Sequence, residues 1–129
     1  MKTEAKLKAA FIRELLLQCP SYRVLHYSTA GAPDRGIVGN GISTRWEFKH
    51  ATPGITSKGD QELMCMRLAE LGHCKYILWV EAGGVKATII ATPKAIYQWQ
   101  QGKALRPESW CEGFNHKWLV EQVKKAHGL

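Results

Sequence analysis

Three residues near the middle of the chain have the types and spacing for metal-assisted hydrolysis. Asp34 follows a proline in a turn-forming segment, and Glu47 and Lys49 lie two residues apart at the end of an expected strand. Residues two apart on a strand face the same way, so Glu47 and Lys49 share one side. If Asp34 approaches that side across a hairpin, two carboxylates converge beside an ammonium group. Such hard oxygen ligands suit Mg²⁺, with water and a phosphate completing its coordination.

A metal ion held there would lower the pKa of a bound water and stabilise charge on a phosphate. Lys49 would orient or deprotonate that water, or stabilise the pentacovalent centre, and the residues alone leave these roles open. Each part also has a structural explanation. Pro-Asp is a common turn dipeptide, and Glu47 and Lys49 taken alone would more often be a solvated strand face. It is therefore the combination that indicates a site.

The surrounding elements follow a mixed α/β pattern with a central sheet. The expected order is a helix over 3–18, strands over 22–29, 37–38 and 42–48, a helix over 58–71, strands over 75–80 and 85–91, a helix over 93–100 and a last helix over 116–127. Asn40-Gly41 between two apolar stretches is a strong hairpin signal. Thr92 and Asn115 are expected to cap the last two helices. Residues 102–114 are expected to be irregular.

Composition favours a basic globular protein. The 129 residues suffice for one hydrophobic core, and the formal charge of +7 favours polyanionic partners, although a basic surface by itself names no function. The four cysteines are scattered, which predicts free, mostly buried thiols in a reducing cytoplasm. We expect no signal peptide and no membrane span, because no apolar run is long enough.

The pattern Pro33-Asp34 followed by Glu47-x-Lys49 resembles the signature of the PD-(D/E)xK nuclease superfamily. Within it, the resemblance is strongest to the small stand-alone VRR-NUC nucleases of phages and bacteria. It is carried by three stretches: Gly31-Ala32-Pro33-Asp34, Glu47-Phe48-Lys49-His50 and Ser57-Lys58-Gly59-Asp60-Gln61. The resemblance covers about residues 4–82. It implies one nuclease domain over 1–129, with a restriction-endonuclease-like core over about 4–91 and a C-terminal helical extension over about 92–129.

The resemblance also implies an activity, which is metal-dependent hydrolysis of DNA phosphodiester bonds. Branched or junction DNA is a common substrate among such relatives. Asp34 and Glu47 would bind Mg²⁺, for which Mn²⁺ would substitute, and the backbone carbonyl of Phe48 would add a ligand. Lys49 would serve the attacking water. The host cytoplasm would be the site of action if a phage encodes the chain.

Further residues enter through the same resemblance. The family tends to carry a glutamate on its first helix, and Glu4 matches that placement better than Glu14, although both stay candidates. The candidate substrate contacts are polar or basic residues near the motif: Lys58, Gln61, Arg35 and His50.

Two other functions fit parts of the sequence. A non-catalytic nucleic-acid-binding module could keep the nuclease fold, although the complete Asp/Glu/Lys set argues against it. A basic protein-interaction domain of unrelated fold would make the motif accidental. We also expect a homodimer, with an interface from the aromatic segment 110–114 together with Trp118 and Leu119.

Overall fold

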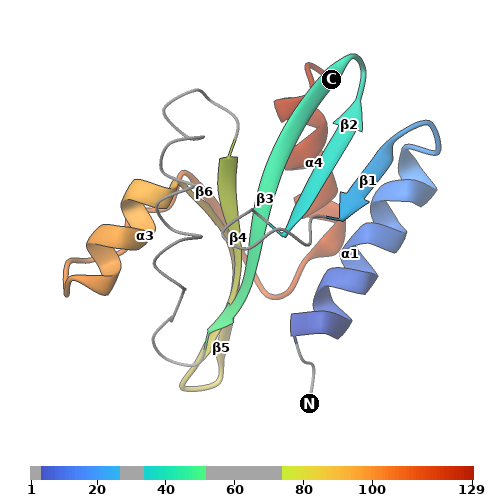
Figure 1. Ribbon diagram of the computed structural model, residues 1–129. Helices are drawn as coiled ribbons and strands as arrows, with labels where there is room; N and C mark the ends of the chain where they lie inside the picture. The colour runs from blue at the N-terminus through green and yellow to red at the C-terminus, as the bar shows by residue number, and fades with distance from the viewer. Residues whose placement is uncertain (1–3, 27–33, 52–73) are drawn as a thin grey trace.

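The computed structural model describes residues 4–26, 34–51 and 74–129 (Figure 1). The elements are α1 (Glu4–Gln18), β1 (Arg23–His26), β2 (Arg35–Gly39), β3 (Ile42–Ala51), β4 (Cys74–Ala82), β5 (Val85–Ala91), α3 (Pro93–Gln100), β6 (Ser109–Glu112) and α4 (His116–Ala126). Three predicted segments lie outside the described residues: the first residue of the helix over 3–18, the strand end over 27–29 and the helix over 58–71.

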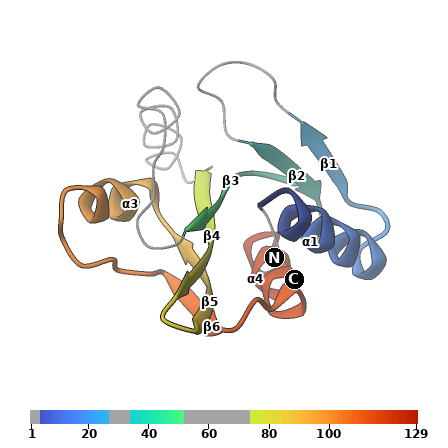
Figure 2. The same ribbon diagram turned by 90° about the horizontal axis from the view of Figure 1, so that it is seen from below.

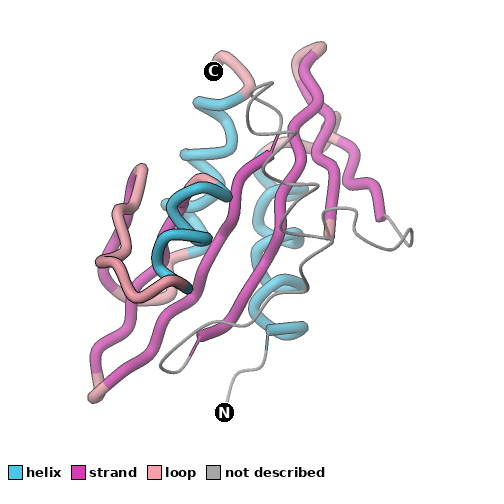
Figure 3. The backbone as a smooth tube through the Cα atoms, turned by 60° about the vertical axis from the view of Figure 1, so that its left-hand side comes forward, coloured by secondary structure: helices cyan, strands magenta, loops and turns pink. Residues whose placement is uncertain are grey.

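The described strands form one sheet in the order β1-β2-β3-β4-β5-β6. Neighbouring strands are antiparallel except β3 and β4, which run parallel from Arg45 opposite Cys74 to Ala51 opposite Val80. Figure 3 shows these two long strands side by side within the twisted sheet. Helices flank the sheet, so the expected mixed α/β architecture is confirmed.

The hairpin between β2 and β3 positions the candidate residues. Asn40 and Gly41 both have positive φ, at 52° and 74°, as a two-residue hairpin turn with the right twist requires. The hairpin predicted from these two residues is therefore confirmed. The strand expected over 37–38 is longer than predicted, because Arg35 and Gly36 also pair with β3 and belong to β2.

One face of the sheet packs against α1 and α4 (Figure 2). Leu7, Phe11 and Leu15 recur at four-residue intervals on α1, and all three are fully buried. They pack in one cluster with Trp46 and Phe48 of β3. The same cluster contains three buried residues of α4: Leu119, Val120 and Val123. The last helix therefore contributes to the same core as the first.

The other face packs against α3. Tyr76 and Leu78 of β4 lie in a buried cluster with Ile96 of α3. The predicted caps are confirmed, since the Thr92 side chain accepts a hydrogen bond from the Ala95 N–H and the Asn115 side chain accepts one from the Trp118 N–H. No helix in the described part of the chain is long and apolar enough to cross a membrane.

Two expectations for the C-terminal region are wrong. Residues 109–112, expected to be irregular, form the edge strand β6 paired with β5. Four residues are too few to show a strand period, and the strand depends on its partner. Leu119, expected at a dimer interface, is fully buried in the core, whereas Trp110 of the same expected interface is 61% exposed.

A buried histidine ties the end of α4 to the β2–β3 hairpin. The His127 ring lies 2.8 Å from the Gly39 carbonyl through Nδ1 and 2.8 Å from Thr44 Oγ1 through Nε2. The Asn40 side chain donates to the His127 carbonyl at 2.7 Å. These contacts join residues more than eighty positions apart, so no local sequence pattern could predict them.

Candidate functional site

Glu47 is a buried acidic residue near the end of β3. Its neighbours Trp46 and Phe48 point into the core beneath α1 and α4, and strand alternation directs Glu47 to the opposite face of the sheet. The Glu47 side chain is only 2% exposed. One of its oxygens, Oε2, is buried and has no hydrogen-bond partner among the described residues. Buried polar atoms are normally satisfied, so this oxygen requires an explanation.

The environment raises the pKa of Glu47 from 4.5 to about 7. Burial is the main cause, because it disfavours the charged form. Lys49 lowers the pKa through its positive charge, whereas Asp34 raises it. A backbone hydrogen bond at Phe48 lowers it, and Glu4 adds a further small increase. Near neutral pH this carboxyl group is therefore close to half protonated.

The structure brings Asp34 beside Glu47. Arg35 pairs with Trp46 in the antiparallel β2–β3 ladder, so Asp34, the residue before β2, falls next to Glu47. The increase that Asp34 causes in the Glu47 pKa agrees with this placement. We call Glu4, Asp34, Glu47 and Lys49 the Glu47 site.

Two cations hold Asp34. Lys8 Nζ lies 2.7 Å from Asp34 Oδ2, and Arg35 donates through Nη1 to Asp34 Oδ1 at 2.7 Å and to its backbone carbonyl at 2.9 Å. All three side chains are less than 20% exposed. Sequence reasoning missed Lys8, although its position one helical turn after Glu4 puts both residues on one side of α1.

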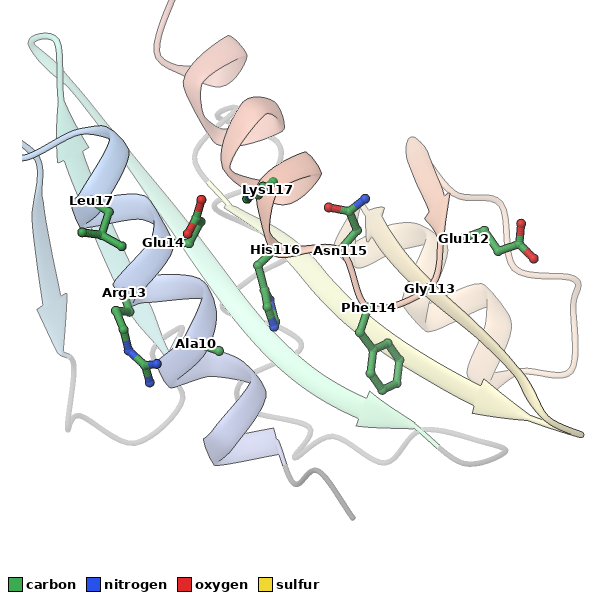
Figure 4. A pocket seen from close by; sticks show the side chains of 10 residues that line it. All are labelled: Ala10, Arg13, Glu14, Leu17, Glu112, Gly113, Phe114, Asn115, His116 and Lys117. Atoms are coloured by element: carbon green, nitrogen blue, oxygen red, sulfur yellow. The ribbon is translucent and has the colours of Figure 1, made fainter.

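The two glutamates considered on the first helix lie in different places. Glu4, at the start of α1, is close enough to Glu47 to raise its pKa. Glu14 accepts a hydrogen bond from Gln18 and lines a separate hollow of about 660 Å³. Figure 4 shows this hollow between Ala10, Arg13, Glu14 and Leu17 on α1 and the segment 112–117.

Of the four candidate substrate contacts, the structure describes His50 and Arg35. His50 points to the α1 side of the sheet, with Nε2 at 3.9 Å from Glu81 Oε2 and its ring edge-on to Phe114. Arg35 is bound to Asp34, as described above. Lys58 and Gln61 lie outside the described residues.

The donor set is chemically suited to a hard divalent cation. Carboxylate and carbonyl oxygens are the ligands such ions prefer, and the unpartnered Glu47 oxygen offers a coordination position. A cation there would also remove the cost of ionising a buried carboxyl group. However, no group of three or more His, Cys, Asp or Glu residues in the described part of the chain is already arranged to hold a metal ion. Asp34 instead has both oxygens in ion pairs.

The comparisons with known proteins are sparse. No family model matches the chain, and no curated protein matches it. Among solved structures, the chain is similar to Hjc, a Holliday junction resolvase from Archaeoglobus fulgidus, with 13% identity and a TM-score of 0.42. The match covers 67% of this chain and 78% of the resolvase. A likeness of this strength assigns neither an activity nor site residues to the chain.

Proposed function

We propose that this chain is a metal-dependent DNA endonuclease of the PD-(D/E)xK type that hydrolyses phosphodiester bonds in branched or junction DNA. The observation that carries the proposal is the state of Glu47. It is a buried carboxyl group with a pKa of about 7, and one of its oxygens has no hydrogen-bond partner among the described residues. The charge of Asp34 raises this pKa, and the charge of Lys49 lowers it. Strongly perturbed carboxyl groups beside specific charged partners are typical of functional sites.

Stability alone gives no reason to bury Glu47. A glutamine or an apolar residue at this position would avoid the desolvation of a charge. The carboxyl group therefore costs free energy of folding, and binding of a cation would recover that cost. This favours a functional role for Glu47 over a structural one.

Each residue of the Glu47 site has a proposed role. Asp34, Glu47 and the Phe48 carbonyl would hold Mg²⁺ or Mn²⁺, with Glu4 as a weaker contributor. The ion would supply Lewis-acid stabilisation of phosphate charge and acidify a water molecule. The Lys49 ammonium group would orient the same water for attack, or bind a phosphate oxygen and stabilise the charge that develops there.

The formal charge of +7 supports DNA as the polyanionic partner. Arg35, His50, Lys58 and Gln61 are proposed substrate contacts. A homodimer would let two sites act on the two strands of a junction, and the exposed Trp110 on β6 is a proposed contact between copies. Membership of the VRR-NUC group, a phage origin and action in the host cytoplasm belong to the same proposal.

One observation favours a second function. Asp34 is neutralised by Lys8 and Arg35, as expected in a non-catalytic nucleic-acid-binding module that keeps the fold. The two functions differ in their dependence on metal, because only the endonuclease needs a cation at Glu47.

Cleavage of a labelled four-way junction and of supercoiled plasmid with Mg²⁺, Mn²⁺ or EDTA tests the proposal. The wild type is compared with Asp34→Asn and Lys49→Met, and with Lys125→Met on α4 as a control of matched chemistry. We expect metal-dependent cutting that Asp34→Asn and Lys49→Met abolish and the control keeps. Tight, salt-sensitive DNA binding without cutting would instead support the binding module.

A further inference from the structure

The structure places a cation pair where the proposed metal ion would bind. Lys8 Nζ and Arg35 Nη1 each lie 2.7 Å from a different oxygen of Asp34, so each carboxylate oxygen has a cationic partner. Lys8 comes from α1 and Arg35 from β2, so two elements converge on one carboxylate. Lys8 is also held in place over the Phe48 ring, 5.8 Å from its centroid.

A divalent cation and these two side chains compete for Asp34. The carboxylate has only two oxygens, and a metal ion beside it would repel the nearby ammonium and guanidinium groups. The proposed metal ion can use Asp34 fully only when at least one of these cations moves away. Lys8 carries a single ammonium group on a flexible stem, whereas Arg35 is also fixed by its hydrogen bond to the Asp34 carbonyl.

DNA supplies the alternative partner for the displaced cation. A phosphate group near Asp34 would accept the Lys8 ammonium through a charge-assisted hydrogen bond. We propose that Lys8 is an internal counter-ion of Asp34 that moves to a DNA phosphate when the metal ion binds, so that metal and DNA strengthen each other's binding. The inference rests on the proposed function, because it needs both ligands to meet at Asp34.

Two consequences follow from this exchange. The free protein binds divalent cations weakly, and bound DNA raises that affinity by the same factor by which the cation raises DNA affinity. Lys8 contacts a phosphate only in the metal-loaded complex. The salt dependence of DNA binding is therefore steeper by about one phosphate contact with metal than without it.

The test uses Lys8→Met, which keeps an unbranched side chain of nearly the same length but removes the charge together with the cation–π contact to Phe48, and Lys8→Gln as a second variant. Calcium binding to the free protein is measured by titration calorimetry, because Ca²⁺ accepts carboxylate ligands in flexible geometry. Junction DNA binding is measured by fluorescence anisotropy with and without Ca²⁺ at several salt concentrations, and electrophoresis checks that the DNA stays intact. Lys125→Met is the control, and thermal unfolding shows that each variant folds.

We expect the Lys8 variants to bind Ca²⁺ roughly three- to tenfold more tightly than wild type without DNA. In wild type, Ca²⁺ should tighten DNA binding by roughly tenfold or more, and the variants should lose most of that factor. The steeper salt dependence with Ca²⁺ should disappear in the variants and persist in Lys125→Met.

Unchanged or weaker Ca²⁺ binding in both variants, with the coupling intact, would overturn the inference and leave Lys8 as a support for Asp34. The proposed function would survive that result if Asp34→Asn still abolished Ca²⁺ binding. A wild-type protein that binds neither Ca²⁺ nor DNA would overturn both.

Discussion

Glu47 and His127 are both almost completely buried, and their surroundings are opposite. His127 is fully buried at the end of α4, where the Gly39 carbonyl and Thr44 Oγ1 lie within hydrogen-bond distance of its two ring nitrogens. Glu47 is 2% exposed on β3, and its Oε2 has no partner among the described residues. The first side chain is explained by the fold that it joins together. Glu47, in contrast, keeps an oxygen that can still accept a hydrogen bond or bind a cation. This difference distinguishes His127, a structural polar group, from Glu47, a candidate functional one.

The largest expected effect is the loss of cleavage in Glu47→Gln. The amide keeps the shape but cannot supply a charged oxygen ligand, so we expect metal-dependent junction cleavage to fall by roughly 100-fold or more. The rate of product formation with saturating Mg²⁺ measures this. A variant that cuts like wild type would show that the unpartnered oxygen has no functional meaning.

His127→Ala should have the opposite profile. It removes a buried ring together with its hydrogen bonds to the Gly39 carbonyl and Thr44 Oγ1, so stability should fall by about 2–4 kcal/mol. Chemical denaturation measures the free energy of unfolding. At a temperature where the variant is folded, cleavage per folded molecule should stay near the wild-type value. If the folded variant instead bound metal more weakly, His127 would not be purely structural, which would contradict the contrast with Glu47.

The pH dependence of stability distinguishes the two residues further. The pKa of Glu47 is about 7 in the folded protein against an ordinary value of 4.5, so the folded state binds more protons between these values and stability falls as pH rises through that range. Without metal, Glu47→Gln should therefore be more stable than wild type at pH 8 by about 1–3 kcal/mol. At pH 4 that advantage should vanish. Denaturant unfolding at the two pH values measures this, and an equal difference at both would contradict the raised pKa.

The smallest expected effect concerns the hairpin contact of His127. Asn40→Gly keeps the positive φ of the turn but removes the hydrogen bond to the His127 carbonyl, so the free energy of unfolding should fall by about 0.5–1.5 kcal/mol. Denaturant midpoints for Asn40→Gly alone and combined with His127→Ala would show whether the two losses overlap. If the two losses of stability add fully, the hydrogen bond of Asn40 contributes independently of the His127 side chain, which would contradict a shared connection between α4 and the hairpin.

The sequence predicted those parts of the fold that depend on local signals. The Asn40-Gly41 hairpin and the Thr92 and Asn115 caps are confirmed because each follows from turn chemistry or helix capping. The predicted free thiols are confirmed for Cys19 and Cys111, of which Cys19 is buried. Strand β6 was missed because its formation depends on pairing with β5.

The candidate site was predictable only in part. Strand alternation placed Glu47 and Lys49 on one side, but it could not show that Glu47 would be buried and Asp34 enclosed by two cations. The ion pair of Asp34 with Lys8 depends on α1 lying close to the start of β2, which no local pattern encodes. The contacts of His127 with the hairpin escaped prediction for the same reason.

The most direct test of the central claim is the titration of the Glu47 carboxyl group by carbon-detected NMR, with and without Mg²⁺. The account predicts a pKa of about 7 for Glu47 in the metal-free protein, and a clear decrease when Mg²⁺ is added, because the ion binds the charged form. A pKa near 4.5 that does not respond to Mg²⁺ would contradict the account. Burial would then not disfavour the charged form of Glu47, and Glu47 would not be a ligand of the metal.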